Sequence, residues 1–179
     1  RLIRNDEAGA ETQRARDELH ADLVLFPELT LSGYPPEDLL FHRGLRQQMA
    51  SALQQVAAAS EGIGLLVGYP EYAGGEIFNT AGLYRDGRLL AQHRKCCLPN
   101  YKVFDEKRYF SAGSDSTVLD YRGFRIGLLV CEDAWESAPA RQAREQGAEL
   151  LLIINASPYE IHKQREREQV LGERVRETG

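Results

Sequence analysis

The sequence predicts an α/β fold in which a mixed sheet is covered by helices. Two observations carry this prediction. Strand-like apolar runs alternate with segments of helical periodicity along the 179 residues. Two pairs of strand-like runs are also joined directly by the turn dipeptides Asp86-Gly87 and Arg122-Gly123, and Asp-Gly is a strong hairpin signal. Together, the alternation and the hairpins predict a mixed sheet with helices packed on it.

The first expected elements are a helix and a short strand. Residues 11–20 form the helix, since Ala15 and Leu19 fall on one face and the charged side chains point outward. The apolar run at 23–27 forms the strand. Pairing is expected to stop at Pro27, because proline cannot donate a hydrogen bond to a sheet.

Two prolines and a long amphipathic helix come next. Residues 34–36, Tyr-Pro-Pro, form a rigid loop that starts a helix, since proline is tolerated in a first helical turn. The segment 43–60 is a long helix, and the run 63–69 is a buried strand. The apolar residues of the long helix recur at helical spacing and are Leu45, Met49, Leu53, Val56 and Ala57.

The remaining elements are two hairpins, two helices and a strand. In chain order they are the hairpin strands 77–84 and 88–93, the hairpin strands 117–121 and 124–130, a helix at 139–146, a strand at 150–154 and a very polar helix at 161–177. Glutamates alternate with the basic residues of the last helix, which favours a solvated face with i,i+4 pairs over a nucleic-acid stripe. A surface for another subunit is the other interpretation.

Composition excludes several classes of partner. Both signs of charge are interleaved and the net charge is −5, which argues against nucleic acid and against a membrane surface. The chain has no long uncharged apolar run and no signal-peptide core. Three cysteines, with Cys96 and Cys97 adjacent, do not form a disulfide framework, and a reducing cytoplasm is the expected location. No Cys/His set has zinc spacing, so no metal is expected.

Three chemically capable side chains follow predicted strands. Glu28 follows Pro27, Lys95 follows the second strand of the first hairpin, and Cys131 follows the apolar run 126–130. Taken singly, they have ordinary interpretations as a loop carboxylate, a surface lysine and a small buried residue.

Together, the three residues form a complete set for hydrolysis of a carbon–nitrogen bond. A thiol attacks a carbonyl as the thiolate, so it needs a nearby base, and a glutamate can supply one. The tetrahedral intermediate carries an oxyanion, which a fixed ammonium and a backbone N–H stabilise. The set Glu28, Lys95 and Cys131 therefore predicts C–N hydrolysis through a thioester.

Longer strings around these residues resemble the nitrilase superfamily of carbon–nitrogen hydrolases, and within it the glutaminase domains of glutamine-dependent NAD synthetases. The strings that separate these domains from other nitrilases are Pro-Pro-Glu-Asp-Leu at 35–39, Leu-Pro-Asn-Tyr at 98–101 and Cys-Glu-Asp-x-Trp at 131–135. Further matching strings lie at 26–29, 103–110 and 155–159. The resemblance covers the chain from about residue 22 onward.

The resemblance implies roles for individual residues. In the Glu-Lys-Cys triad of that superfamily, Glu28 is the general base, Lys95 stabilises the oxyanion and Cys131 is the nucleophile. The residues expected near the bound glutamine are Tyr34, Tyr101, Glu106 and Ser157, with Glu106 as a second glutamate beside the lysine and the substrate amide. The tyrosines have an alternative role as wall aromatics, and Ser157 as a helix cap.

Two positions depart from the family pattern. Lys102 stands where relatives have glycine, and Cys97 stands where they commonly have histidine. Both changes affect the expected shape of the glutamine pocket and leave the triad intact. Cys96 and Cys97 are expected to be bystanders, because no acid–base partner lies in the same motif.

The resemblance further implies a four-layer α-β-β-α sandwich with mixed sheets, truncated here at both ends. Residues 1–179 are then part of a carbon–nitrogen hydrolase domain, and the synthetase domain that uses ATP and Mg²⁺ is absent. The glutaminase domain itself needs no cofactor. The implied substrates are glutamine and, in the full-length enzyme, deamido-NAD, and a homo-oligomer is expected.

Three functions remain open on the sequence. The leading one is glutamine hydrolysis that supplies ammonia for the amidation of deamido-NAD. The second is a free-standing nitrilase-superfamily amidase acting on another small amide with the same triad. The third is a catalytically silent assembly domain, against which the intact triad argues.

Overall fold

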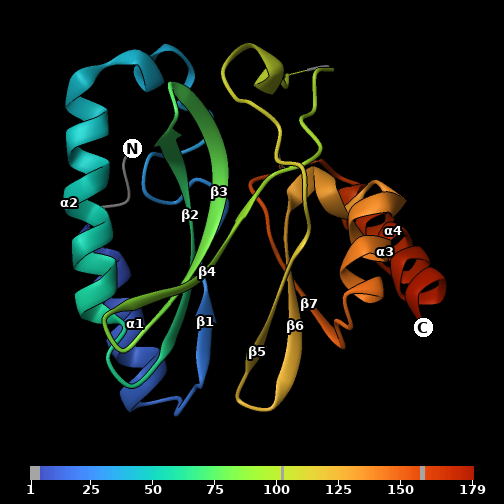
Figure 1. Ribbon diagram of the computed structural model, residues 1–179, viewed down its shortest axis with the longest axis horizontal. Helices are drawn as coiled ribbons and strands as arrows, with labels where there is room; N and C mark the ends of the chain where they lie inside the picture. The colour runs from blue at the N-terminus through green and yellow to red at the C-terminus, as the bar shows by residue number, and fades with distance from the viewer. Residues whose placement is uncertain (1–4, 102, 158–159) are drawn as a thin grey trace.

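The computed structural model describes residues 5–101, 103–157 and 160–179. Four layers are stacked in the order helix, sheet, sheet, helix (Figure 1). Helices α1 (Asn5–Asp17) and α2 (Arg43–Ala59) cover one sheet, and α3 (Ser137–Glu145) and α4 (Lys163–Thr178) cover the other. This arrangement confirms the predicted α-β-β-α sandwich.

The two sheets contain all seven described strands. The first has the order β1-β2-β3-β4, in which β1 is parallel to β2 and the other pairs are antiparallel. The second has the order β5-β6-β7, with β5 antiparallel and β7 parallel to β6. The bounds are β1 Leu23–Leu25, β2 Gly64–Ala73, β3 Glu76–Arg85, β4 Arg88–Arg94, β5 Thr117–Tyr121, β6 Phe124–Val130 and β7 Leu150–Ile154. Both predicted hairpins are therefore present.

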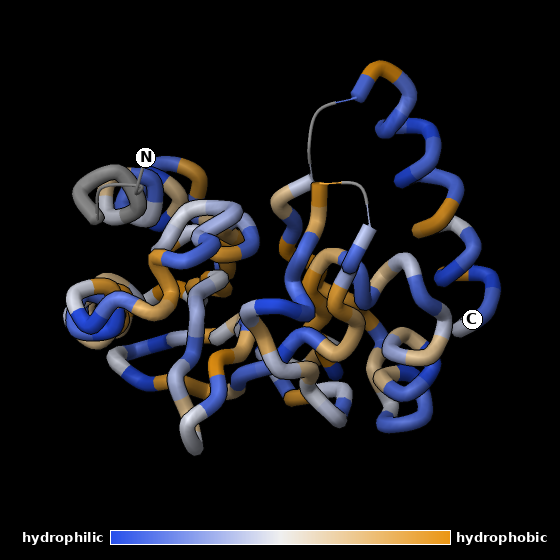
Figure 2. The backbone as a smooth tube through the Cα atoms, turned by 90° about the horizontal axis from the view of Figure 1, so that it is seen from above, coloured by the Kyte–Doolittle hydropathy of each residue, from blue (hydrophilic) through white to orange (hydrophobic). Residues whose placement is uncertain are grey.

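Strand β2 lies at the centre of the packing and explains the continuous apolar run in its sequence. Successive side chains of a strand point to opposite faces. Leu65 and Val67 pack against α1 and α2 in one core, whereas Leu66 packs between the sheets with Leu128 and Val130 in another. Figure 2 shows the contrast with α4, whose length is mostly hydrophilic. No helix among the described residues is long and apolar enough to cross a membrane.

Several element boundaries differ from the prediction. Helix α1 ends at Asp17, and Leu19, expected to face the core, is 65% exposed because it lies beyond the helix end. The helix predicted after the two prolines is a short 3-10 helix, η1 (Glu37–Phe41). Strand β2 continues past the predicted end through Pro70, since the short β1 leaves this part of its edge unpaired.

Two predictions fall on residues outside the described ranges. They concern Lys102 and the Pro158-Tyr159 part of the last family-like string, for which the structure gives no description.

Candidate active site

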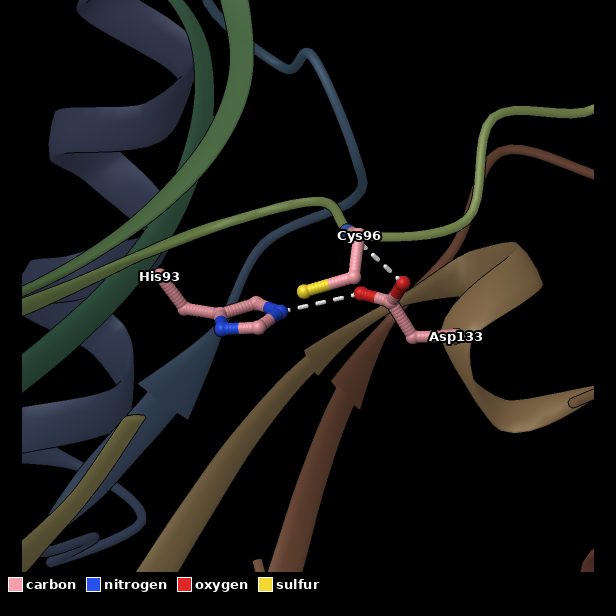
Figure 3. A group of neighbouring side chains, drawn as sticks. All are labelled: His93, Cys96 and Asp133. Atoms are coloured by element: carbon pink, nitrogen blue, oxygen red, sulfur yellow. Dashed lines mark hydrogen bonds and ion pairs between the residues drawn. The ribbon is translucent and has the colours of Figure 1, made fainter. Parts of the chain in front are cut away.

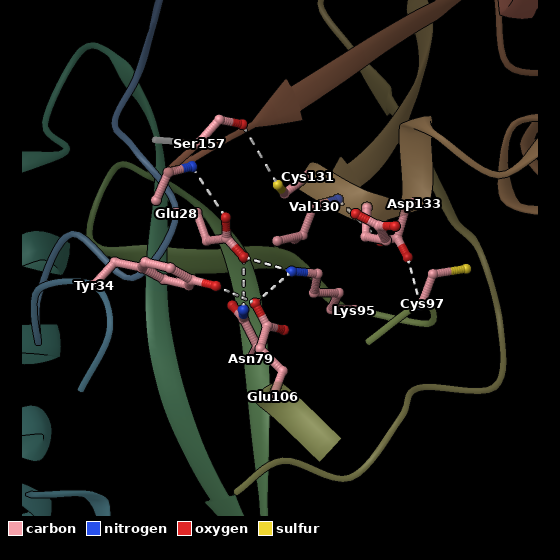
Figure 4. Close-up of polar contacts among 12 residues, drawn as sticks. Glu28, Tyr34, Asn79, Lys95, Cys97, Glu106, Val130, Cys131, Asp133 and Ser157 are labelled. Atoms are coloured by element: carbon pink, nitrogen blue, oxygen red, sulfur yellow. Dashed lines mark hydrogen bonds and ion pairs between the residues drawn. The ribbon is translucent and has the colours of Figure 1, made fainter. Parts of the chain in front are cut away.

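The structure brings Glu28, Lys95 and Cys131 together at one edge of the sandwich (Figure 4). Glu28 lies three residues beyond β1, and Lys95 directly follows β4. Strands β1 and β4 both run in the direction of β2, so their ends meet at the same edge. Cys131 directly follows β6 of the facing sheet. The three side chains are 2%, 1% and 6% exposed respectively, so substrate would meet them in an almost dry environment.

The Glu28 carboxylate is held by three donors. Its Oε1 accepts from Lys95 Nζ at 2.7 Å and from Asn79 Nδ2 at 2.8 Å, and its Oε2 accepts from the backbone N–H of Ala156 at 3.0 Å. The loop that carries it packs directly on β2 at Gly68. A Cβ at Gly68 would lie 2.4 Å from the backbone nitrogen of Leu29, so only glycine allows this approach.

The Lys95 ammonium lies between two carboxylates. Besides Glu28, it contacts Glu106 Oε1 at 2.8 Å. Burial alone lowers the pKa of Lys95, but the charges of Glu28 and Glu106 outweigh burial and raise that pKa above its ordinary value. Lys95 is therefore a permanent cation in a dry pocket.

Cys131 occupies a constrained turn. Strand β6 ends at Val130, and Cys131 opens the 3-10 turn η3 (Cys131–Ala134) with a φ of 45°. This left-handed conformation costs an L-residue roughly 1–2 kcal/mol, and such strain is typical of functional turns. Burial, and then the Glu28 charge, raise the pKa of Cys131 to about 12, whereas Lys95 acts in the opposite direction. At neutral pH the sulfur is a thiol, and its proton must be removed for it to react.

Three of the four expected substrate-binding residues lie beside this cluster. Tyr34 donates to Glu106 Oε1 at 2.8 Å, and Ser157 Oγ lies 4.0 Å from Cys131 Sγ. Burial raises the pKa of Glu106, and its Oε2 is buried without a hydrogen-bond partner among the described residues. Glu106 therefore offers an unused polar atom next to Lys95.

Tyr101 is placed differently from the other three. Its hydroxyl donates to both oxygens of Glu132 at 3.0 Å, and the side chain is 48% exposed. Its ring packs edge-on against Phe104, which in turn contacts Tyr34. Tyr101 thus lies on the outer wall, and within the described part of the chain its hydroxyl bonds to Glu132 and not to the Glu28–Lys95 pair.

Sequence reasoning missed the role of Asn79. This residue is fully buried in β3, and its amide orients Glu28. The available signal was a lone amide within the otherwise apolar start of the strand, Ile77-Phe78-Asn79. A buried amide needs a hydrogen-bond partner.

Cys96 and Cys97 lie outside the cluster. Burial and the nearby Asp133 charge raise the pKa of each thiol to about 12, as for Cys131. Acidity therefore does not distinguish the three thiols, but position does. The Cys97 sulfur points away from the Glu28–Lys95 pair (Figure 4), and the Cys96 sulfur contacts the carbonyl oxygens of Arg94 and Asp115.

Comparison with known proteins finds a matching family model and similar curated proteins. The model of the carbon–nitrogen hydrolase family matches residues 4–174. The glutamine-dependent NAD(+) synthetase of Xanthomonas campestris pv. campestris is 48% identical over 167 residues, which are 92% of this chain and 30% of that protein. The corresponding Xylella fastidiosa protein is 47% identical over 93% of this chain and 31% of its own length. The chain thus spans about a third of the curated relatives it matches.

Solved structures similar to this chain include another glutamine-dependent NAD+ synthetase and an amidase. The glutamine-dependent NAD+ synthetase of Acinetobacter baumannii superposes with a TM-score of 0.90 at 36% identity, over 94% of this chain and 32% of that one. A mutant of the amidase from Nesterenkonia sp. AN1, which shows Michael addition of acrylamide at its active-site cysteine, superposes with a TM-score of 0.86 at 28% identity. That match covers 97% of this chain and 68% of the amidase.

Proposed function

Because the chain belongs to the carbon–nitrogen hydrolase family, we propose that it hydrolyses the side-chain amide of glutamine through a thioester on Cys131. The observation that carries the proposal is the buried Glu28–Lys95 pair at 2.7 Å beside the thiol. In this proposal Glu28 acts as a base, Lys95 as a cation and Cys131 as a nucleophile within one dry pocket. The similarity to NAD synthetases supports glutamine as the substrate.

The first half of the reaction forms the thioester. Glu28 removes the proton of Cys131, and the thiolate attacks the amide carbon. Lys95 faces the oxygen on which negative charge develops, and its fixed ammonium stabilises that oxyanion. When the carbon–nitrogen bond breaks, Glu28 returns the proton to nitrogen, and ammonia leaves.

The second half releases glutamate. Water takes the place of ammonia, Glu28 removes a proton from it, and the resulting hydroxide attacks the thioester carbon. The Cys131 sulfur then leaves and regains its proton. In the first half the unused Oε2 of Glu106 can accept from the N–H of the substrate amide. In both halves its Oε1 holds Lys95 and Tyr34 in place.

The released ammonia serves a second reaction in this proposal. The relatives are about three times longer than this chain, and they are glutamine-dependent NAD(+) synthetases. Ammonia from glutamine would amidate deamido-NAD in a synthetase domain, where ATP and Mg²⁺ would be used. The glutaminase reaction itself uses only the residues described above. A reducing cytoplasm and a homo-oligomeric assembly complete the proposal.

The test is substrate preference in the natural full-length protein. Glutamate release from glutamine should exceed hydrolysis of asparagine and of simple aliphatic amides, and Cys131→Ala should abolish it. The same variant should still make NAD from free ammonia, because the synthetase reaction does not need the thiol. Preference for a simple amide would instead support the free-standing amidase. Absence of any amide hydrolysis would support the assembly domain.

A further inference from the structure

A second polar cluster, next to Lys95 and Cys131 in the chain, is formed by His93, Cys96 and Asp133 (Figure 3). Asp133, in the turn η3, and His93, on β4, are both completely buried. Asp133 Oδ2 accepts from His93 Nε2 at 2.9 Å. Since a carboxylate only accepts, Nε2 carries the hydrogen. His93 Nδ1 is buried without a partner among the described residues, which fits the neutral ring with its hydrogen on Nε2.

The same carboxylate also holds backbone groups on both sides of the site. Its Oδ1 accepts from the N–H groups of Cys96 at 2.9 Å and Cys97 at 2.8 Å, the two residues that follow Lys95. Its Oδ2 also accepts from the N–H of Val130 at 3.0 Å, the residue before Cys131. One buried side chain therefore ties the end of β4 in one sheet to the end of β6 in the other.

We propose that Asp133, oriented by His93, is a positioning residue that fixes the Lys95 ammonium relative to the Cys131 sulfur. Lys95 lies between His93 and Cys96 in the chain, and both are bound to this carboxylate. Cys131 lies between Val130 and Asp133 in the strained turn. Any movement of Asp133 would shift the two sides relative to each other. The catalytic part of this inference rests on the proposed glutaminase function.

The geometry also allows a different interpretation of the cluster. Ligand atoms of His93, Cys96 and Asp133 lie within 4.8 Å of one another, a spacing that suits a metal ion. However, the Asp133 carboxylate already accepts four N–H groups, two at each oxygen. A carboxylate offers about four lone-pair positions, so a cation would have to displace one of these donors. The hydrogen-bond pattern therefore favours positioning.

Asp133→Asn is the direct test. In either orientation its NH₂ group faces backbone N–H donors, those of Cys96 and Cys97 on one side or that of Val130 on the other. The site loses its alignment, and a misplacement of about 1 Å can lower the rate about 100-fold. We expect kcat per titratable Cys131, measured on the full-length protein, to fall on that scale with little change in KM for glutamine.

Variants of His93 separate positioning from stability. His93→Leu removes the donor to Asp133 and should lower kcat, whereas His93→Gln keeps an N–H near the same place and should restore it. Because both residues act through one carboxylate, adding His93→Leu to Asp133→Asn should lower kcat no further. Additive losses, or equal losses in the Leu and Gln variants, would overturn the proposal.

Ser60→Ala is the matched control. Ser60 is completely buried, and its hydroxyl donates to the Ala57 carbonyl and accepts from the Gly87 N–H, at the opposite end of β4. Its loss should lower Tm but leave kcat unchanged. Treatment with EDTA should also leave wild-type kcat unchanged. Loss of activity with EDTA that is reversed by Zn²⁺ would establish the metal interpretation instead.

The alkylation of Cys131 keeps this test independent of the substrate. Iodoacetamide alkylates Cys131 without glutamine. In His93→Leu, displacement of Lys95 should slow this alkylation, whereas in His93→Gln the alkylation rate should not change. If the wild type does not hydrolyse glutamine and this pattern is found, the proposed function fails and the positioning role stands. If glutamine is hydrolysed and the pattern is absent, the positioning role fails alone.

Discussion

The ammonium of Lys95 lies 2.7 Å from Oε1 of Glu28 while both side chains are almost completely enclosed. A buried charge is tolerated only when it is paired and hydrogen-bonded. With Glu106 at 2.8 Å, one ammonium faces two carboxylates, and the excess negative charge lies next to Cys131. Together with burial, the Glu28 charge therefore opposes ionisation of the Cys131 thiol and raises its pKa.

The reactivity of Cys131 should therefore depend on pH as that of a weakly acidic thiol does. Burial and Glu28 raise its pKa to about 12 from 9.0, so the thiolate fraction is lower than in a free cysteine and grows with pH. We expect the rate of iodoacetamide alkylation at Cys131, followed by mass spectrometry, to keep rising up to about pH 10. A plateau below about pH 8 would instead indicate a preformed thiolate.

Replacement of Glu28, the proposed base, should slow turnover strongly without unfolding the protein. In Glu28→Gln the side chain still accepts hydrogen bonds but cannot take the thiol proton. General-base catalysis contributes about 10²–10⁴-fold, so kcat for glutamine should fall by that factor. The control is Glu71→Gln, which removes a carboxylate on β2 that pairs with Arg94 outside the site. Equal kcat in both variants would exclude Glu28 as the base.

Gly68 should be required for the position of Glu28. An alanine Cβ there would lie 2.4 Å from Leu29 N and 2.8 Å from Glu28 Cα, so the loop must move. We expect Gly68→Ala to lower kcat about 100-fold, the effect of a small misplacement. Gly44→Ala is the control, since a Cβ there meets nothing within 4 Å and should stabilise α2 by up to about 1 kcal/mol. Wild-type kcat in Gly68→Ala would show that the loop tolerates the shift.

That Glu28, Lys95 and Cys131 meet at one edge could be predicted from sequence, because each of them stands beside a strong local signal. Glu28 follows Pro27, and Cys131 follows an apolar strand, so the ends of these strands were visible in the pattern. The hairpin turn Asp86-Gly87 placed β4, and with it Lys95, in the same way. Where the end of an element depends on neighbours distant in sequence, as at Leu19 and Pro70, the prediction was wrong.

The remaining part of the site could not be predicted, because it depends on contacts between residues that are far apart in the sequence. Asn79 and Glu28 are 51 residues apart, and His93 and Asp133 are 40 apart. No periodicity within one strand indicates which distant side chain it will meet. The positive φ of Cys131 was likewise hidden, because the residue is neither glycine nor asparagine and the strain is maintained by the surrounding turn.

The Glu71–Arg94 pair should make stability sensitive to acid. The hydrogen bond from Arg94 lowers the pKa of Glu71 below 4.5. A carboxyl group whose pKa is lower in the folded state stabilises the fold above its unfolded pKa, and this contribution is lost as pH falls through the folded pKa. At neutral pH, Glu71→Gln should lower the free energy of unfolding by up to about 1 kcal/mol. The effect is no larger because the pair is partly exposed. In urea unfolding, the difference in free energy of unfolding between the variant and the wild type should shrink steadily as pH falls below 4.5. A constant difference would assign the cost to packing.

The identity of the nucleophile is the central claim, and a glutamine-like diazo-ketone tests it most directly. This reagent carries the recognition groups of glutamine and alkylates the sulfur that attacks it. Cys96 and Cys97 have thiols as weakly acidic as Cys131, so the label separates them by position and not by acidity. Peptide mapping of the labelled native protein should find one adduct, on Cys131, and an excess of glutamine should prevent it. An adduct on Cys96 or Cys97 with Cys131 unmodified would contradict the assignment.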